Sequence, residues 1–107
     1  MKYRADNDFY LFPKELLNNE KYYNLSSNSK ILYAILLEKH YINNELGVKD
    51  SDNRTYVTLP NDSIRELLNV SSKNAIIKMK NELVKNDLLK QIRRGGGKSN
   101  KLYVRIL

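Results

Sequence analysis

Apolar residues recur at helical spacing in the middle of the chain, and the longest such segment runs from about residue 28 to 42. Apolar side chains there would fall on nearly every face of a helix, as in the run Ile35-Leu36-Leu37. A helix that is apolar nearly all round lies inside a core, so we expect this segment to be the central helix. Ser26 and Ser27 precede it and are good N-cap residues.

Two further helices are predicted on either side of a short polar turn. The first follows Pro60, with Asn61 or Asp62 as its cap, and is apolar on one face. Asn69 is expected to end it, because asparagine tolerates a positive φ. The second spans about 72–86 and gathers apolar side chains on one face, namely Ala75, Ile76, Met79 and Leu83.

The remaining elements are predicted strands. Residues 56–59 form a short β-prone run after a polar loop at 43–55. Segments 88–93 and 102–106 can pair as a hairpin, since Leu102, Val104 and Ile106 alternate with Tyr103 and Arg105 as in a half-buried strand.

Helix, short strand, short helix, turn, longer helix and hairpin is the order of a winged helix-turn-helix. We therefore predict an α+β fold, mostly helical with a small antiparallel sheet and a C-terminal hairpin wing, as a single domain over residues 1–107. Residues 1–24 form an N-terminal arm with a short helical stretch at 14–19. The arm carries the large apolar side chains Phe9, Tyr10, Leu11 and Phe12. They must be covered either by folding back or by a second subunit.

Several functional classes are disfavoured by composition. The chain has no cysteine and one histidine, His40, which we interpret as structural and near the end of its helix. Asp50 and Asp52 lack the ligand pattern of a calcium loop, and Gly97-Lys98-Ser99 lacks the P-loop glycine, because position 92 is Ile92. We expect no metal, no cofactor and, without paired carboxylates, no enzymatic activity. Without an apolar membrane span or a secretory signal, we expect no membrane contact and a cytoplasmic, bacterial location.

Charge is concentrated in the C-terminal third. Residues 71–107 contain ten basic and two acidic side chains, a net charge of +8, whereas residues 1–70 carry −1. So lopsided a distribution favours a polyanionic partner, although a basic run can also be a merely solvated face.

The basic residues fall on two features suited to double-stranded DNA. One is a polar stripe on the helix at about 72–86, which would enter the major groove, where asparagine suits adenine and lysine suits guanine. The other is a glycine-rich wing at 93–101, which would lie on the phosphate backbone or in the minor groove, unless it is only a solvated loop. The predicted DNA-binding residues are Ser71, Ser72, Lys73, Asn74, Ile77, Lys78, Asn81 and Lys85 of the helix, and Arg93, Arg94, Lys98 and Lys101 of the wing.

Five segments also resemble the N-terminal domain family of RepA plasmid replication initiators. They are residues 9–17 (FYLFPKELL), 22–26 (YYNLS), 30–33 (KILY), 74–82 (NAIIKMKNE) and 100–103 (NKLY). The N-terminal string is the most specific, because winged helices in general do not share it.

The resemblance implies a dimeric winged helix that binds direct repeats, or iterons, at the origin of theta-replicating plasmids of Gram-positive bacteria. It implies that Phe9, Tyr10, Leu11 and Phe12 contribute to dimerisation. It also implies that the chain is a fragment of a longer initiator, whose C-terminal domain recruits host replication proteins. Two alternatives stay open from the residues themselves: a transcriptional repressor with the same fold, and a winged helix used for protein contacts.

Overall fold

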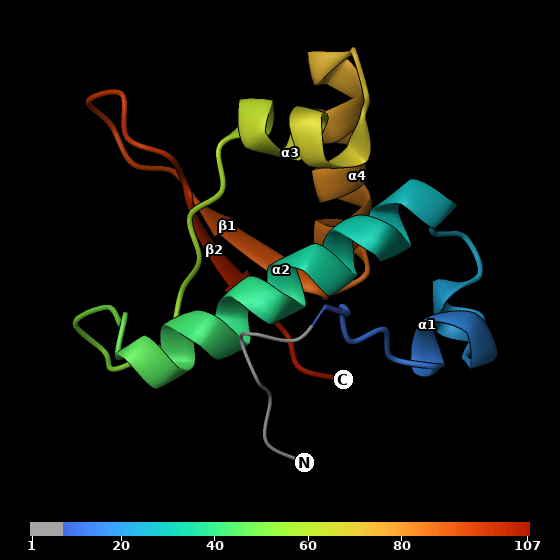
Figure 1. Ribbon diagram of the computed structural model, residues 1–107, viewed down its shortest axis with the longest axis horizontal. Coiled ribbons are helices and arrows are strands. Elements are labelled where there is room, and N and C mark those ends of the chain that lie inside the picture. The colour runs from blue at the N-terminus through green and yellow to red at the C-terminus, as the bar shows by residue number, and fades with distance from the viewer. Residues whose placement is uncertain (1–7) are drawn as a thin grey trace.

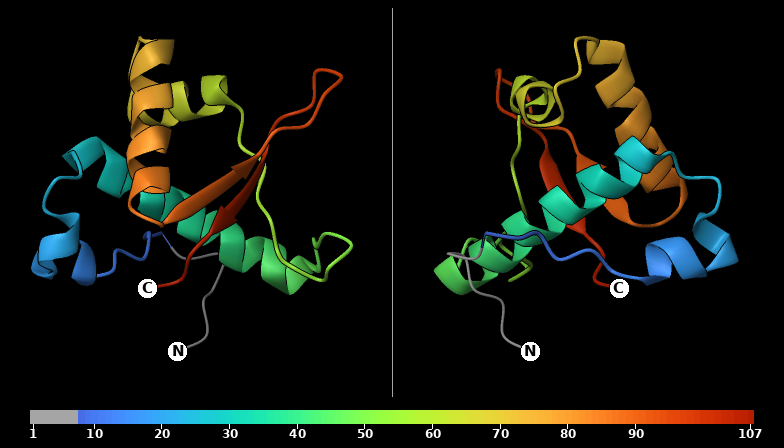
Figure 2. Two further views of the ribbon diagram at one scale, coloured as in Figure 1. Left: turned by 180° about the vertical axis from the view of Figure 1, so that it is seen from behind. Right: turned by 45° about the vertical axis from the view of Figure 1, so that its right-hand side comes forward.

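A computed structural model describes residues 8–107, so the first part of the predicted arm, residues 1–7, lies outside the described residues. The elements follow in the order α1 (Glu15–Asn18), the 3₁₀ helix η1 (Glu20–Tyr22), α2 (Ser27–Leu46), α3 (Asn61–Leu68), α4 (Lys73–Lys85), β1 (Leu89–Ile92) and β2 (Lys101–Val104) (Figure 1). Helices α2, α3 and α4 pack around one core, and β1 and β2 form an antiparallel hairpin whose long loop projects from the body (Figures 1 and 2). The predicted winged helix-turn-helix is confirmed.

Helix α2 is the central helix, as its pattern predicts. Leu32, Tyr33 and Leu36 have no exposed surface, and the Ser26 hydroxyl caps the helix by accepting from the Ser29 amide at 3.1 Å. The predicted end at residue 42 was wrong, because the helix continues to Leu46. It stops only at Gly47, the first residue after 42 that supplies a left-handed conformation (φ 75°) without a steric cost.

The hairpin has the predicted pairing but shorter strands. Leu89 faces Val104 and Gln91 faces Leu102 across it. The expectation that Ile106 continues the alternation was wrong, because β2 ends at Val104 and Ile106 is 43% exposed. Beyond that point the backbone of Arg105 has other partners: its amide donates to the Leu88 carbonyl, and its carbonyl accepts from the hydroxyl of buried Tyr33.

The strand predicted at 56–59 is reduced to a single bridge. Val57 and Leu102 exchange two backbone hydrogen bonds of 2.8 Å, which adds one residue pair to the edge of the hairpin. Pro60 follows three residues later as the N-cap of α3, and this leaves no room for a longer ladder.

The helix-turn-helix itself follows the prediction except at its first cap. Helix α3 begins at Asn61 with Pro60 as N-cap, and neither Asn61 nor Asp62 caps it. Asn69 ends α3 in the left-handed conformation, with φ 53°, as predicted. The Ser72 hydroxyl then caps α4 by accepting from the amide of the residue three positions on, at 3.3 Å.

The N-terminal apolar cluster is only partly covered within the chain. Leu11 packs against the core, whereas Phe9, Tyr10 and Phe12 are 80%, 50% and 40% exposed. Folding back therefore accounts for one of the four side chains, and a second subunit stays a prediction for the others.

Candidate nucleic-acid interface

Helix α4 presents the predicted polar stripe to solvent. Asn74, Lys78, Asn81 and Lys85 are all exposed. On the opposite side Ile76 and Leu83 have no exposed surface and hold the helix to the core. Ile77, 40% exposed, adds an apolar side chain beside the stripe.

The one acidic residue of α4, Glu82, is hydrogen-bonded to other residues of the protein. Its carboxylate accepts a hydrogen bond from the Ser26 amide at 2.9 Å and another from the Ser29 hydroxyl at 3.1 Å. Glu82 therefore binds the N-terminal turn of α2, where the helix dipole favours an anion, and ties α4 to the central helix. This contact leaves the basic groups to dominate the outer face of α4.

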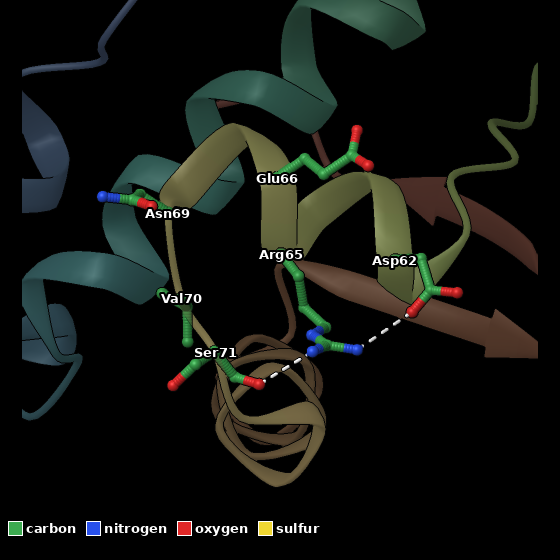
Figure 3. A pocket seen from close by; sticks show the side chains of 6 residues that line it. All are labelled: Asp62, Arg65, Glu66, Asn69, Val70 and Ser71. Atoms are coloured by element: carbon green, nitrogen blue, oxygen red, sulfur yellow. Dashed lines mark hydrogen bonds and ion pairs between the residues drawn. The ribbon is translucent and has the colours of Figure 1, made fainter.

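The turn between α3 and α4 is braced by Arg65, as Figure 3 shows. One terminal nitrogen of its guanidinium donates to the Ser71 carbonyl at 2.8 Å, and the other donates to the Asp62 carboxylate at 3.2 Å. The Val70 amide donates back to the Arg65 carbonyl at 3.0 Å. Together these bonds fix the angle at which α4 leaves the turn, and they leave the side chain of Ser71 exposed.

The predicted wing residues divide into two pairs. Arg94 is half-buried and closes the loop, because its Nε donates to the Ser99 carbonyl at 2.9 Å. Lys101 is also half-buried, with its ammonium 4.7 Å from the ring centroid of Tyr56. Arg93 and Lys98 are exposed and can reach a partner without breaking such contacts.

Two glycines shape the wing loop. Gly96 and Gly97 have φ of 70° and 74°, a region that other residues enter at a cost, and a side chain at either position would meet only open space. Their conformational freedom, not steric crowding, is what the tip of the wing requires.

A cluster of hydrogen bonds that the sequence did not reveal, which we call the clasp, joins β2 to the loop after α2. The Tyr103 hydroxyl donates to the Asp50 carboxylate at 2.8 Å, and the amides of Asp52 and Arg54 donate to the same carboxylate at 2.9 Å each. The Arg54 guanidinium also lies 5.1 Å from the Tyr103 ring centroid. These donors, first of all the Arg54 amide and then the Tyr103 hydroxyl, lower the pKa of Asp50.

A pocket of about 360 Å³ separates α4 from the base of the wing, and Lys80 is the residue there that sequence reasoning missed. Lys80 is only 7% exposed, and its ammonium donates to the Asn61 side-chain carbonyl at 2.7 Å. Burial lowers its pKa. A signal existed, since a lysine four residues after Ile76 and three before Leu83 must fall on the buried face of the helix.

The remaining predicted features lie elsewhere. The described part of the N-terminal arm lies at the opposite end of the molecule from the N-terminus of α4 and the wing tip (Figures 1 and 2). The prediction that His40 lies near the end of its helix was wrong, because α2 continues for six residues beyond it to Leu46. Burial, followed by the charge of Lys49, lowers the pKa of His40.

Two kinds of feature are absent from residues 8–107. No group of three or more histidine, cysteine or carboxylate side chains there could hold a metal ion. No helix in this range is long and apolar enough to cross a membrane.

Comparison with known structures finds several chains of the same architecture, and three of them match 92% of this chain each. "N-Terminal domain of DNA binding protein" is 36% identical (TM-score 0.76), and this chain covers 74% of it. "Structure of Rep-DNA complex" is 35% identical (TM-score 0.77), with 75% covered. "Structure of MDR initiator" is 32% identical (TM-score 0.75), with 76% covered.

Comparison with sequences extends the likeness to a longer protein and to a family. A "41 kDa protein" of Lactobacillus helveticus is 30% identical over 93 residues, which are 87% of this chain and 26% of that protein. The chain therefore spans about a quarter of the length of this relative. The model of the family "Replication initiator protein A (RepA) N-terminus" matches residues 8–107. The chain accordingly belongs to the replication initiator protein A N-terminal family.

Proposed function

We propose that this chain binds double-stranded DNA with α4 and the wing, and that it thereby places a longer initiator protein on direct repeats at a plasmid origin. One observation carries the proposal: the exposed stripe of α4 and the wing lie in the part of the chain that has ten basic and two acidic side chains. One of those two acids, Glu82, is bound to the N-terminal turn of α2.

The geometry suits a duplex. The N-terminus of α4 and the tip of the wing project from the same end of the molecule (Figure 2). With α4 in a major groove about 12 Å wide, the wing would reach the neighbouring backbone or minor groove. Ser71 and Ser72 would then lie at the groove edge. The Ser72 hydroxyl accepts from the α4 backbone, so its hydrogen can still be donated to a phosphate.

The stripe also suggests which bases are read. The amides of Asn74 and Asn81 suit the N7 and N6 atoms of adenine, and Lys78 suits guanine. Exposed Ile77 lies three residues after Asn74 and four before Asn81, where it could contact a thymine methyl group. A DNA site rich in A·T pairs would therefore be contacted by Asn74, Ile77 and Asn81.

Family membership and the solved relatives support the same function, since one of those relatives is a Rep–DNA complex. We further propose a cytoplasmic, bacterial protein without enzymatic activity of its own. Host replication proteins would contact parts of the longer initiator outside this chain. Exposed Phe9, Tyr10 and Phe12 would pack in a homodimer, which analytical ultracentrifugation of the wild type against F9S/F12S would test.

The test of DNA binding is fluorescence anisotropy with short duplexes tiled across the gene's own coding sequence, against shuffled controls, at two salt concentrations. Tight binding confined to tiles with direct repeats is expected for an origin-binding initiator. Tight binding only to a single inverted repeat over a promoter would favour a repressor instead. No binding to any duplex at low salt would refute the proposal.

A further inference from the structure

Lys80 is a buried cation without an anionic partner. Its ammonium donates to a neutral amide oxygen of Asn61, and within residues 8–107 no carboxylate lies at ion-pair distance from it. Removing an ammonium from water is costly unless an opposite charge compensates it, so a lysine held this way is prepared for an anion.

The pocket around Lys80 has the lining of an anion site. Three cationic side chains line it, from Lys73, Lys80 and Arg93. The rest of its polar lining is neutral and consists of the amide side chains of Asn61, Asn81, Gln91 and Asn100. No acidic residue lines it. Its walls come from the N-terminus of α3, the first residue and the middle of α4, β1 and the wing.

The position of the pocket indicates that its anion is a phosphate of the DNA backbone. Helix α4 and the hairpin diverge from the turn that joins them (Figure 2). Residues of both line the pocket, which therefore lies between them. A duplex that takes α4 in its major groove and the wing beyond must carry one sugar–phosphate strand across this interval, because a single strand separates neighbouring grooves. The strand's phosphate would face the open side of the pocket.

We propose that the pocket between α4 and the wing is a phosphate-binding site, in which Lys80, with Lys73 and Arg93, clamps one backbone phosphate of the bound DNA. The inference rests on the proposed DNA binding and adds to it a residue outside the exposed stripe. The contact carries no base information, so it sets register and affinity but not sequence preference.

The first experiment compares Lys80→Met with Lys90→Met by anisotropy as a function of salt. Methionine keeps the length of the side chain and removes its charge, and Lys90 is an exposed lysine of β1 that does not line the pocket. Each lost phosphate contact lowers the salt slope by about 0.9. When the salt is lowered from 1 M to 0.1 M, the affinity of the wild type should therefore rise about eightfold more than the affinity of K80M. The difference should be the same on specific and random duplexes. K90M should keep the wild-type slope.

The second experiment locates the phosphate. Single neutral methylphosphonates are scanned along the tightest-binding duplex, and one position should weaken the wild type but have no further effect on K80M. Arg93→Met alters an exposed side chain and should lose the effect of the methylphosphonate at the same position. It replaces K80M in the scan if K80M does not fold.

Three results would overturn the inference. One is a wild-type slope for K80M, and another is a scan without coupling to either variant. With intact binding by the wild type, these refute the phosphate site and leave the proposed function standing. The third, a wild type that binds no duplex, refutes both.

Discussion

Removing the Glu82 carboxylate tests whether α4 is positioned by its bond to the N-terminus of α2. In Glu82→Ala the Ser26 amide loses an acceptor at 2.9 Å, and the Ser29 hydroxyl loses one at 3.1 Å. The two losses are unequal. The Ser26 bond is exposed, so water can replace the acceptor at a cost of about 0.5–1 kcal/mol. Ser29 has no exposed surface, but its hydroxyl can turn to the Ser26 hydroxyl oxygen at 2.9 Å, so losing the carboxylate costs about 1–1.5 kcal/mol, the lower end of the range for a buried hydroxyl.

The expected destabilisation by Glu82→Ala is therefore about 1.5–2.5 kcal/mol. A chain of 107 residues unfolds with an entropy of roughly 0.22 kcal/mol/K, so the melting temperature should fall by about 7–11 °C. Glu82→Gln keeps an acceptor oxygen and should lose less than half as much. Thermal unfolding followed by circular dichroism measures both variants.

The matched control is Glu66→Ala, which removes an exposed carboxylate from α3. It should change the melting temperature by only a degree or two, as surface substitutions usually do. If Glu82→Ala were no more destabilising than this control, the carboxylate would not hold α4 to α2. The same variant offers a functional readout, because a displaced α4 should bind specific DNA more weakly despite the gain of one unit of positive charge.

Three further predictions concern the DNA-binding surface and the clasp. Asn74→Ala should cost about 1–3 kcal/mol of binding to specific duplexes and relax base preference, and equal losses on specific and random DNA would show that α4 does not read bases. Lys98→Met should flatten the salt slope by roughly one unit, whereas Lys101→Met should do less because that ammonium lies against Tyr56; equal slopes for the wild type and both variants would remove the wing from the phosphates. The clasp predicts a pH dependence. The folded-state pKa of Asp50 is lowered, so its stabilisation is present above the ordinary carboxyl pKa of about 4 and is lost as the pH falls through the folded-state value. Tyr103→Phe should reduce this acid-dependent loss, and a melting temperature that falls with acid as steeply as in the wild type would exclude the hydroxyl as a contributor.

Much of the architecture was determined by the sequence through short-range rules. The run of apolar residues after Ser26 requires a buried helix, and the face from Ile76 to Leu83 requires an amphipathic one. Asn69 ends α3 as predicted, and Gly96 and Gly97 take the positive φ that the wing loop needs. These features depend on residues a few positions apart, and the sequence displays such spacings directly.

The tertiary structure alone decided which polar groups meet. Glu82 meets Ser26 across 56 positions, and Tyr103 meets Asp50 across 53. Periodicity placed the exposed stripe of α4 correctly, but it could not show that the neighbouring acid is bound elsewhere. The free energy of a charged side chain differs little between water and a suitable protein partner. The residues next to it in the sequence therefore do not show which of the two it contacts. Only the packing of α2 and the loop after it against α4 and β2 brings those partners within hydrogen-bonding distance.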